Sequence, residues 1–148
     1  MPFSAQTLPT VLVVDDYPDL ADMLAHFFSR QGMMPLVAYS GRQCLEIVRQ
    51  KPIDVIVLDV MMPDMDGLEV CAALRRMASP LFIPVILLTA KDDLETRLAA
   101  MRLGVSEFLL KPIRGRDLLA RIHTQLEVSW QTRVMERMLA NSNVNIEV

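Results

Sequence analysis

The sequence predicts an α/β fold, a doubly wound five-stranded parallel sheet with helices on both faces and an extended C-terminal helix. Two observations support this prediction. Short apolar runs without polar alternation recur along the chain, as expected for strands that are buried on both faces of a parallel sheet. Helical patterns fill the intervals between these runs, and strict alternation of strand and helix favours parallel strands joined by right-handed crossovers.

Five runs are predicted as strands. Four are strongly apolar and span residues 11–14, 55–58, 84–88 and 108–110. The fifth, residues 35–39, starts with a proline, which cannot donate a hydrogen bond to a neighbouring strand. This run therefore suits the edge of the sheet.

The predicted helices are recognised by apolar residues at helical spacing and by end signals. Gly32 and Gly104 follow such patterns and should end the first and fourth helices, and Ser40 with Gln43 forms a capping-box pair before the second. The apolar positions that mark the five helices are Leu20, Met23, Leu24 and Phe27; Cys44, Leu45, Ile47 and Val48; Leu68, Cys71 and Ala72; Leu94, Leu98 and Met101; and Leu118, Leu119, Ile122 and Leu126.

The pattern of the fifth helix continues beyond the length that a five-stranded domain requires. Trp130, Val134 and Met138 follow Leu126 at intervals of four residues. We therefore expect one domain over residues 10–128 and, over residues 129–148, a helical extension or a linker towards an effector domain. The apolar stripe predicts a homodimer contact or a rod that leads to an effector.

Composition restricts the classes of function. The chain has 148 residues, of which 52% are apolar and 22% are charged, as in a folded single domain. A net charge of -3 and the lack of a Lys/Arg-rich run argue against nucleic acid and membrane surfaces as partners. The sequence carries no recognisable signal peptide or membrane span, so we expect a cytoplasmic protein in which Cys44 and Cys71 are reduced core thiols.

Polar residues follow each of the four strong strands. Asp15 and Asp16 follow the first, Asp59 the second, Thr89 the third and Lys111 the fourth. A single aspartate at such a place is more often a turn residue or a helix cap. However, the carboxyl ends of parallel strands line one cleft, where ligands of open α/β sheets bind. Four strand ends together therefore favour a functional site.

The charges of this group suggest its ligand. Two carboxylates about 4 Å apart repel by about 4 kcal/mol at an effective dielectric constant near 20. Lys111 supplies only one positive charge against three carboxylates. Mg²⁺ takes hard oxygen ligands, commonly one or two carboxylates with phosphate oxygens and waters. The cleft is therefore predicted to hold Mg²⁺ and a phosphoryl group.

These residues lie in four motifs, VLVVDD, VIVLDVMMPDMDG, VILLTAKDD and EFLLKP. Their order and spacing resemble the receiver domain of two-component response regulators, over roughly residues 10–128. The resemblance implies a flavodoxin-like sheet with the strand order 2-1-3-4-5. It also implies a phosphorylation-controlled signalling module that accepts its phosphoryl group from a sensor histidine kinase or phosphotransfer protein and turns over no external substrate.

The resemblance assigns the acids of the cleft. It implies that Asp59 is the phosphoacceptor, that Asp16 binds Mg²⁺ directly and that Asp15 acts through a water. The backbone carbonyl of Met61 is implied as a further ligand. Asp64 and Asp66, which follow in the same loop, are interpreted as loop and helix-capping acids and not as ligands.

The resemblance also assigns residues that respond to phosphorylation. Thr89 is implied to donate its hydroxyl to the phosphoryl group, and Lys111 to pair with the phosphoryl oxygens. Phe108 is the switch ring, where the family commonly has tyrosine, so the ring lacks a hydroxyl. The Lys111-Pro112 bond is expected to be cis. Met61 and Lys91 are implied to flank the path of the water that hydrolyses the acyl phosphate.

Two other functions are weaker alternatives. A phosphatase or phosphotransferase of the haloacid-dehalogenase type also uses a strand-end aspartate and Mg²⁺. That class needs a general acid two residues after the nucleophile, where this chain has Met61. Dinucleotide binding is disfavoured because no G-x-G-x-x-G follows the first strand.

Overall fold

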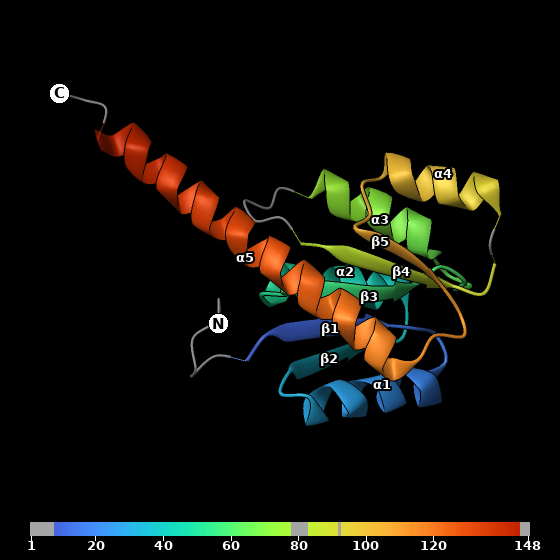
Figure 1. Ribbon diagram of the computed structural model, residues 1–148. Coiled ribbons are helices and arrows are strands. Elements are labelled where there is room, and N and C mark those ends of the chain that lie inside the picture. The colour runs from blue at the N-terminus through green and yellow to red at the C-terminus, as the bar shows by residue number, and fades with distance from the viewer. Residues whose placement is uncertain (1–7, 78–82, 92, 146–148) are drawn as a thin grey trace.

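The computed structural model describes residues 8–77, 83–91 and 93–145. Strands and helices alternate along the chain, as predicted (Figure 1). The elements are β1 Thr10–Val14, α1 Pro18–Arg30, β2 Met34–Ala38, α2 Gly41–Gln50, β3 Val55–Asp59, α3 Gly67–Arg76, β4 Val85–Thr89, α4 Leu94–Arg102, β5 Glu107–Leu110 and α5 Gly115–Asn145.

The five strands form one parallel sheet in the order β2-β1-β3-β4-β5, which confirms the predicted fold class and strand order. β2 lies at one edge, where Pro35 was expected to be tolerated. Chain order reverses between β1 and β3, because β1 has β2 on one side and β3 on the other. The carboxyl ends of β1 and β3 therefore meet at the switch point of the sheet.

The sheet has one hydrophobic core on each face. Alternate side chains of a strand point to opposite faces, so Leu12 packs towards α2, α3 and α4, whereas Val13 packs towards α1 and α5. The predicted core thiols, Cys44 and Cys71, are both buried in the first of these cores. Burial raises the pKa of the Cys44 thiol to about 12, which keeps it protonated and unreactive.

The helix ends agree with the predicted signals except at α2. Gly32 and Gly104 adopt the positive φ angles, 83° and 72°, that a glycine accommodates after a helix. Ser40 accepts a hydrogen bond from the backbone N–H of Gln43, as a capping box requires. The Gln43 side chain, however, accepts from the N–H of Tyr39 and not from that of Ser40, so the reciprocal half of the box is displaced by one residue.

The apolar residues that mark α1 and α4 are less buried than other residues of the same helices, although Leu24 and Phe27 pack against the core. In α1 the buried residues are Ala21, Ala25 and Phe28, and the predicted stripe lies beside them, partly exposed. In α4 only Ala100 is buried among the residues of the helix, while Leu94 and Met101 are 71% and 67% exposed. Small alanines therefore occupy buried positions in both helices, and several of the larger apolar side chains lie towards the rim and solvent.

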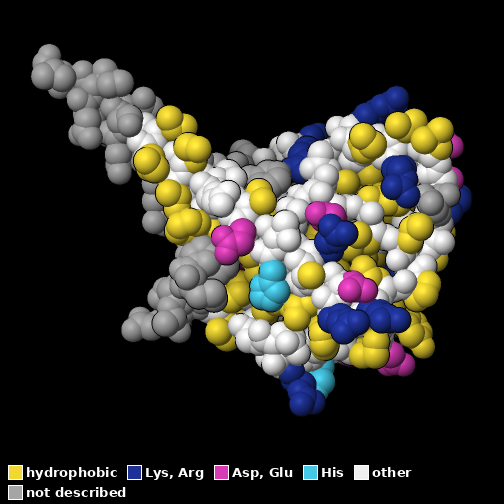
Figure 2. Space-filling view, in the orientation of Figure 1, with side chains coloured by type: hydrophobic (Ala, Val, Ile, Leu, Met, Phe, Trp, Pro, Cys, Tyr) yellow, Lys and Arg dark blue, Asp and Glu magenta, His cyan; other side chains and the backbone are white. Residues whose placement is uncertain are grey.

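The fifth helix is longer than the sheet that it covers, as predicted. Its first half buries Leu118, Ile122 and Leu126 against β1, β3 and β4. Beyond Ser129, the side chains that the structure describes are exposed or half-buried, and Figure 1 shows this part projecting from the body. The space-filling view shows apolar side chains along the projection (Figure 2). The exposed ones are Trp130, Met135, Met138 and Leu139.

Candidate functional site

Three carboxylates meet at the carboxyl end of the sheet. Asp15 and Asp16 follow β1, Asp59 ends β3, and one carboxylate oxygen from each lies within 4.8 Å of the others. Asp15 and Asp59 are buried, whereas Asp16 is exposed. Asp15 is oriented by the N–H of Tyr17, which donates to its Oδ1 at 2.9 Å. The predicted acidic cluster is therefore formed, and one of its members faces solvent.

Lys111 brings a positive charge to two of these acids. Its ammonium nitrogen lies 3.4 Å from Asp15 Oδ2 and 3.6 Å from Asp59 Oδ1. The segment after β5 is aligned with β4 because the N–H of Lys111 donates to the carbonyl of Thr89 at 2.8 Å. The Lys111-Pro112 bond is cis, as expected.

The environment of Asp59 disfavours its ionised form. Burial raises the pKa of this carboxyl above its ordinary value, the Lys111 ammonium opposes this effect, and the Asp15 carboxylate adds to it. The N–H of Met61 donates to Asp59 Oδ1 at 3.4 Å and gives weak support to the anion. A divalent cation beside the cluster would favour the carboxylate over the carboxylic acid.

Thr89 is fully buried at the end of β4, the strand next to β3. Its hydroxyl oxygen accepts a hydrogen bond from the N–H of Lys91 at 3.0 Å. A hydroxyl that accepts in this way keeps its proton for donation to another acceptor. The Lys91 ammonium turns towards Asp93, with 3.5 Å between its nitrogen and Asp93 Oδ2.

Phe108 lies on β5, paired with β4, and packs against the core beneath α4. The guanidinium carbon of Arg97, on α4, lies 4.9 Å from the centre of the Phe108 ring. This cation–π contact joins the ring to α4. Arg97 could not be predicted from the sequence, because a single arginine on an exposed helix carries no signal in the pattern.

The loop after β3 turns away from the acids. Asp66 caps α3, because its Oδ1 accepts from the N–H of Glu69 at 2.8 Å and the Glu69 side chain accepts from the N–H of Asp66. Asp64 is exposed and is not part of the acidic cluster. Both acids therefore have the loop and capping roles predicted for them. Gly67 packs so closely that an added Cβ would lie 2.8 Å from the Asp59 carbonyl oxygen and from the Val60 Cα.

The donor set fits Mg²⁺. Carboxylate oxygens are hard ligands, and the three acids carry more negative charge than Lys111 balances. The side chain of Met61 is 58% exposed at the mouth of the cleft.

Within the residues that the structure describes, no helix has the length and apolar character needed to cross a membrane.

Comparison with known proteins identifies the family. The model of the response regulator receiver domain matches residues 11–123, and the chain belongs to this family. The match favours the receiver interpretation over the haloacid-dehalogenase alternative. The chain is thus a receiver domain, the phosphoryl-accepting signalling module of two-component response regulators.

Two curated relatives are longer than this chain. The transcriptional regulatory protein BaeR of Escherichia coli O6:H1 is 33% identical over 142 residues, which are 96% of this chain and 58% of the relative. The response regulator GtcR of Aneurinibacillus migulanus is 32% identical over 122 residues, which are 82% of this chain and 49% of the relative. The chain therefore spans about half the length of these relatives.

Solved receiver structures share the fold. The receiver domain of the Francisella response regulator 1452 is 32% identical, with a TM-score of 0.74 over 80% of this chain and 97% of its own. The chemotaxis response regulator CheY4 of Vibrio cholerae is 30% identical, with a TM-score of 0.74 over 80% of this chain and 99% of its own.

Proposed function

We propose that Asp59 accepts the phosphoryl group and that this chain catalyses its own phosphorylation and dephosphorylation. The observation that carries the proposal is the position of Asp59, which ends a buried strand within reach of two further carboxylates and the Lys111 ammonium. A rigid strand holds the acceptor oxygen in place, and positioning supplies much of the catalysis of phosphoryl transfer.

The chemistry follows from these residues. A carboxylate oxygen of Asp59 attacks the phosphorus of the donor, a P–O bond forms, and the bond to the leaving group breaks. Lys111 stabilises the phosphoryl oxygens as a positive charge, and the Thr89 hydroxyl donates to one of them. Contact of the phosphoryl group with Thr89 would alter β4, which pairs with the strand that carries Phe108, the proposed switch ring. Because Arg97 of α4 contacts this ring, the change would connect the cleft with α4.

Mg²⁺ is the proposed cofactor of this site. Asp16 and Asp59 would hold it directly, Asp15 through a water, and the Met61 carbonyl would supply a further oxygen. When bound, the ion neutralises negative charge that develops on the transferred group. Donor and acceptor are both anionic, so the acids of this cleft would repel the donor without a cation.

Phosphorylation from a small donor tests the proposal. The full chain is incubated with Mg²⁺ and acetyl phosphate, and intact mass should increase by one phosphoryl group that hydroxylamine removes. Asp59→Asn should abolish the labelling. Asp64→Asn, an exposed acid of the same loop, is the matched control and should label as the wild type does. Labelling of Asp59→Asn, or equal labelling in the presence of EDTA, would refute the assignment.

The partners proposed for the whole protein are a sensor histidine kinase or a phosphotransfer protein as donor. For the projecting part of α5 we propose a homodimer contact or a rod that leads to an effector domain. Residues 130–145 extend about 24 Å at a rise of about 1.5 Å per residue, and an isolated helix of this length is marginal in water. The exposed apolar residues Trp130 and Met138, which belong to the predicted stripe, would be covered by such a partner.

A further inference from the structure

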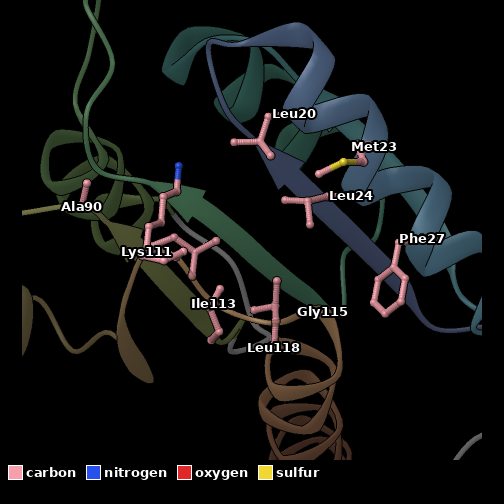
Figure 3. A pocket seen from close by; sticks show the side chains of 11 residues that line it. Leu20, Met23, Leu24, Phe27, Ala90, Lys111, Ile113, Gly115 and Leu118 are labelled. Atoms are coloured by element: carbon pink, nitrogen blue, oxygen red, sulfur yellow. The ribbon is translucent and has the colours of Figure 1, made fainter.

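The backbone of Lys91 lies at the mouth of the cleft. Its N–H donates to the hydroxyl oxygen of Thr89 at 3.0 Å, and this hydroxyl is the proposed donor to the phosphoryl group. Ala90, the residue between them, lines the half-open groove beside α1 together with Lys111, and Figure 3 shows both where the strands end. The Lys111 ammonium lies 3.6 Å from Asp59 Oδ1. The Lys91 side chain therefore starts close to the acceptor.

The Lys91 ammonium is paired with a carboxylate outside the acidic cluster. Its nitrogen lies 3.5 Å from Asp93 Oδ2. The side chain of Lys91 is 67% exposed and that of Asp93 is 34% exposed, so water surrounds much of the pair. Exposed ion pairs of this kind are weak. The ammonium can therefore leave Asp93 when a competing anion comes within its reach.

Asp93 is held in place because it also caps α4. Its Oδ1 accepts a hydrogen bond from the N–H of Thr96 at 2.6 Å, so its two carboxylate oxygens serve different partners. This hydrogen bond is the main cause that lowers the pKa of Asp93 below its ordinary value, and the carboxylate stays ionised. Asp93 is thus a negative charge fixed at the start of α4, two residues after Lys91.

A phosphoryl group on Asp59 would compete with Asp93 for the Lys91 ammonium. A phosphoryl group carries more negative charge than one carboxylate, but Lys111 and Mg²⁺ would neutralise part of that charge. Lysine is a compact charge on a flexible four-carbon stem, so the ammonium can serve either place. On the phosphoryl oxygens, the side chain would cover the approach of water. On Asp93, it would leave that approach open.

We propose that Asp93 is a positioning residue that shortens the lifetime of phosphorylated Asp59 by drawing the Lys91 ammonium away from the phosphoryl group. This inference rests on the proposed function of Asp59. Because an exposed ion pair is weak, we expect the lifetime to change about threefold when the charge of Asp93 is removed.

Two substitutions separate the ion pair from the helix cap. Asp93→Asn keeps a good capping residue without the charge, whereas Asp93→Glu keeps the charge on a residue that is not a preferred cap. Each full chain is phosphorylated with acetyl phosphate and Mg²⁺, the donor is removed, and decay is followed by intact mass. Asp93→Asn should decay about threefold more slowly than the wild type, and Asp93→Glu should decay as the wild type does. A capping role alone predicts the reverse, a change in Asp93→Glu and none in Asp93→Asn.

The matched control is Asp66→Asn, which makes the same change at the cap of α3 and should decay as the wild type does. A double-mutant cycle with Lys91→Met tests whether the effect passes through the lysine. In the Lys91→Met chain, Asp93→Asn should not alter the decay, because no ammonium remains to redistribute. Equal slowing with and without Lys91, or slowing in Asp66→Asn as large as in Asp93→Asn, would overturn the proposal.

The labelling experiment distinguishes this inference from the proposed function. Labelling that persists in Asp59→Asn would refute both, because Asp59 would not be the acceptor. A chain that is labelled at Asp59, and in which Asp93→Asn decays at the wild-type rate or faster, would refute the role of Asp93 and leave the proposed function standing.

Discussion

The pKa of Asp59 links its chemistry to the stability of the domain. Its folded pKa is raised above the ordinary 3.8 chiefly by burial, so the folded chain binds this proton more tightly than the unfolded chain. The resulting stabilisation is complete below the unfolded pKa and is lost as the pH rises through the folded pKa. Without metal, an ionised Asp59 therefore destabilises the fold.

In EDTA, Asp59→Asn should thus raise the midpoint of thermal unfolding at pH 7 by several degrees. The advantage should shrink as the pH falls towards 3.8, where the wild-type carboxyl is protonated. Melting curves recorded from about pH 3.5 to about pH 7 provide the measurement, because this range begins near the ordinary pKa of the carboxyl and extends well above it. Asp64→Asn is the control and should show no such trend. A wild type that is more stable than Asp59→Asn throughout the range would contradict the account.

Two side chains at the mouth of the cleft should set the lifetime of the phosphorylated state. Met61 is exposed, apolar and flexible, and it offers no useful hydrogen bond to orient an attacking water. Lys91 is positively charged and lies two residues after Thr89, and its backbone N–H donates a hydrogen bond to the Thr89 hydroxyl. We predict slow hydrolysis of the acyl phosphate, because neither side chain positions the water.

Met61→Asn and Lys91→Glu should each accelerate the decay several-fold, since each new side chain can hold a water. Decay is followed by intact mass after the donor is removed. Lys51→Glu, the same charge reversal on an exposed lysine at the end of α2, should leave the rate unchanged. Equal decay in all four proteins would show that these positions do not shield the phosphoryl group.

Within single helices and strands, the sequence predicts the features that depend on local backbone requirements. These features are the ends of the strands, the helix cap Asp66 and the glycines that follow α1 and α4. The buried faces of α1 and α4 could not be predicted in this way. Which face turns inward depends on how each helix packs in the assembled domain, and small residues such as Ala21 and Ala100, both fully buried, carry little signal in an apolar pattern.

The same limit applies to the surroundings of the site. The Arg97–Phe108 contact joins α4 to β5. It leaves no periodic pattern in the sequence, so only the assembled structure shows it. In contrast, the five polar residues at strand ends were predictable because parallel strands place their carboxyl ends at one edge.

Gly67 shows how the loop after β3 depends on a missing side chain. In Gly67→Ala the new Cβ would lie 2.8 Å from the Asp59 carbonyl oxygen, and the loop must move. We expect a loss of about 1–3 kcal/mol in the free energy of unfolding and slower labelling of Asp59. Gly32→Ala is the control, because its Cβ meets no atom within 4 Å and only the positive φ is strained. Because the strained φ of Gly32→Ala also lowers stability, the labelling rate decides, and equal rates of Asp59 labelling in the two variants would refute this role for Gly67.

At the scale of the whole molecule, we propose that the projecting half of α5 forms a contact between two copies of the chain. Two copies that cover this stripe should give twice the 16.7 kDa of one chain in light scattering. Replacing Trp130 and Met138, two exposed residues of the stripe, by glutamate should shift the mass to that of one chain, because charge would then line the contact. Met34→Glu, at an exposed methionine of β2, should leave the dimer intact. A monomeric wild type would exclude the dimer and leave the rod as the role of the helix.

The proposed function depends on one side chain, Asp59, as the acceptor of the phosphoryl group. Borohydride reduces an aspartyl phosphate to homoserine, which marks the acceptor permanently and can be located by peptide mass spectrometry. After treatment with acetyl phosphate and Mg²⁺, homoserine should be found at position 59, while Asp15, Asp16 and Asp64 stay intact. Homoserine at any of those positions instead of 59, or no conversion in a chain that has gained a phosphoryl mass, would contradict the account.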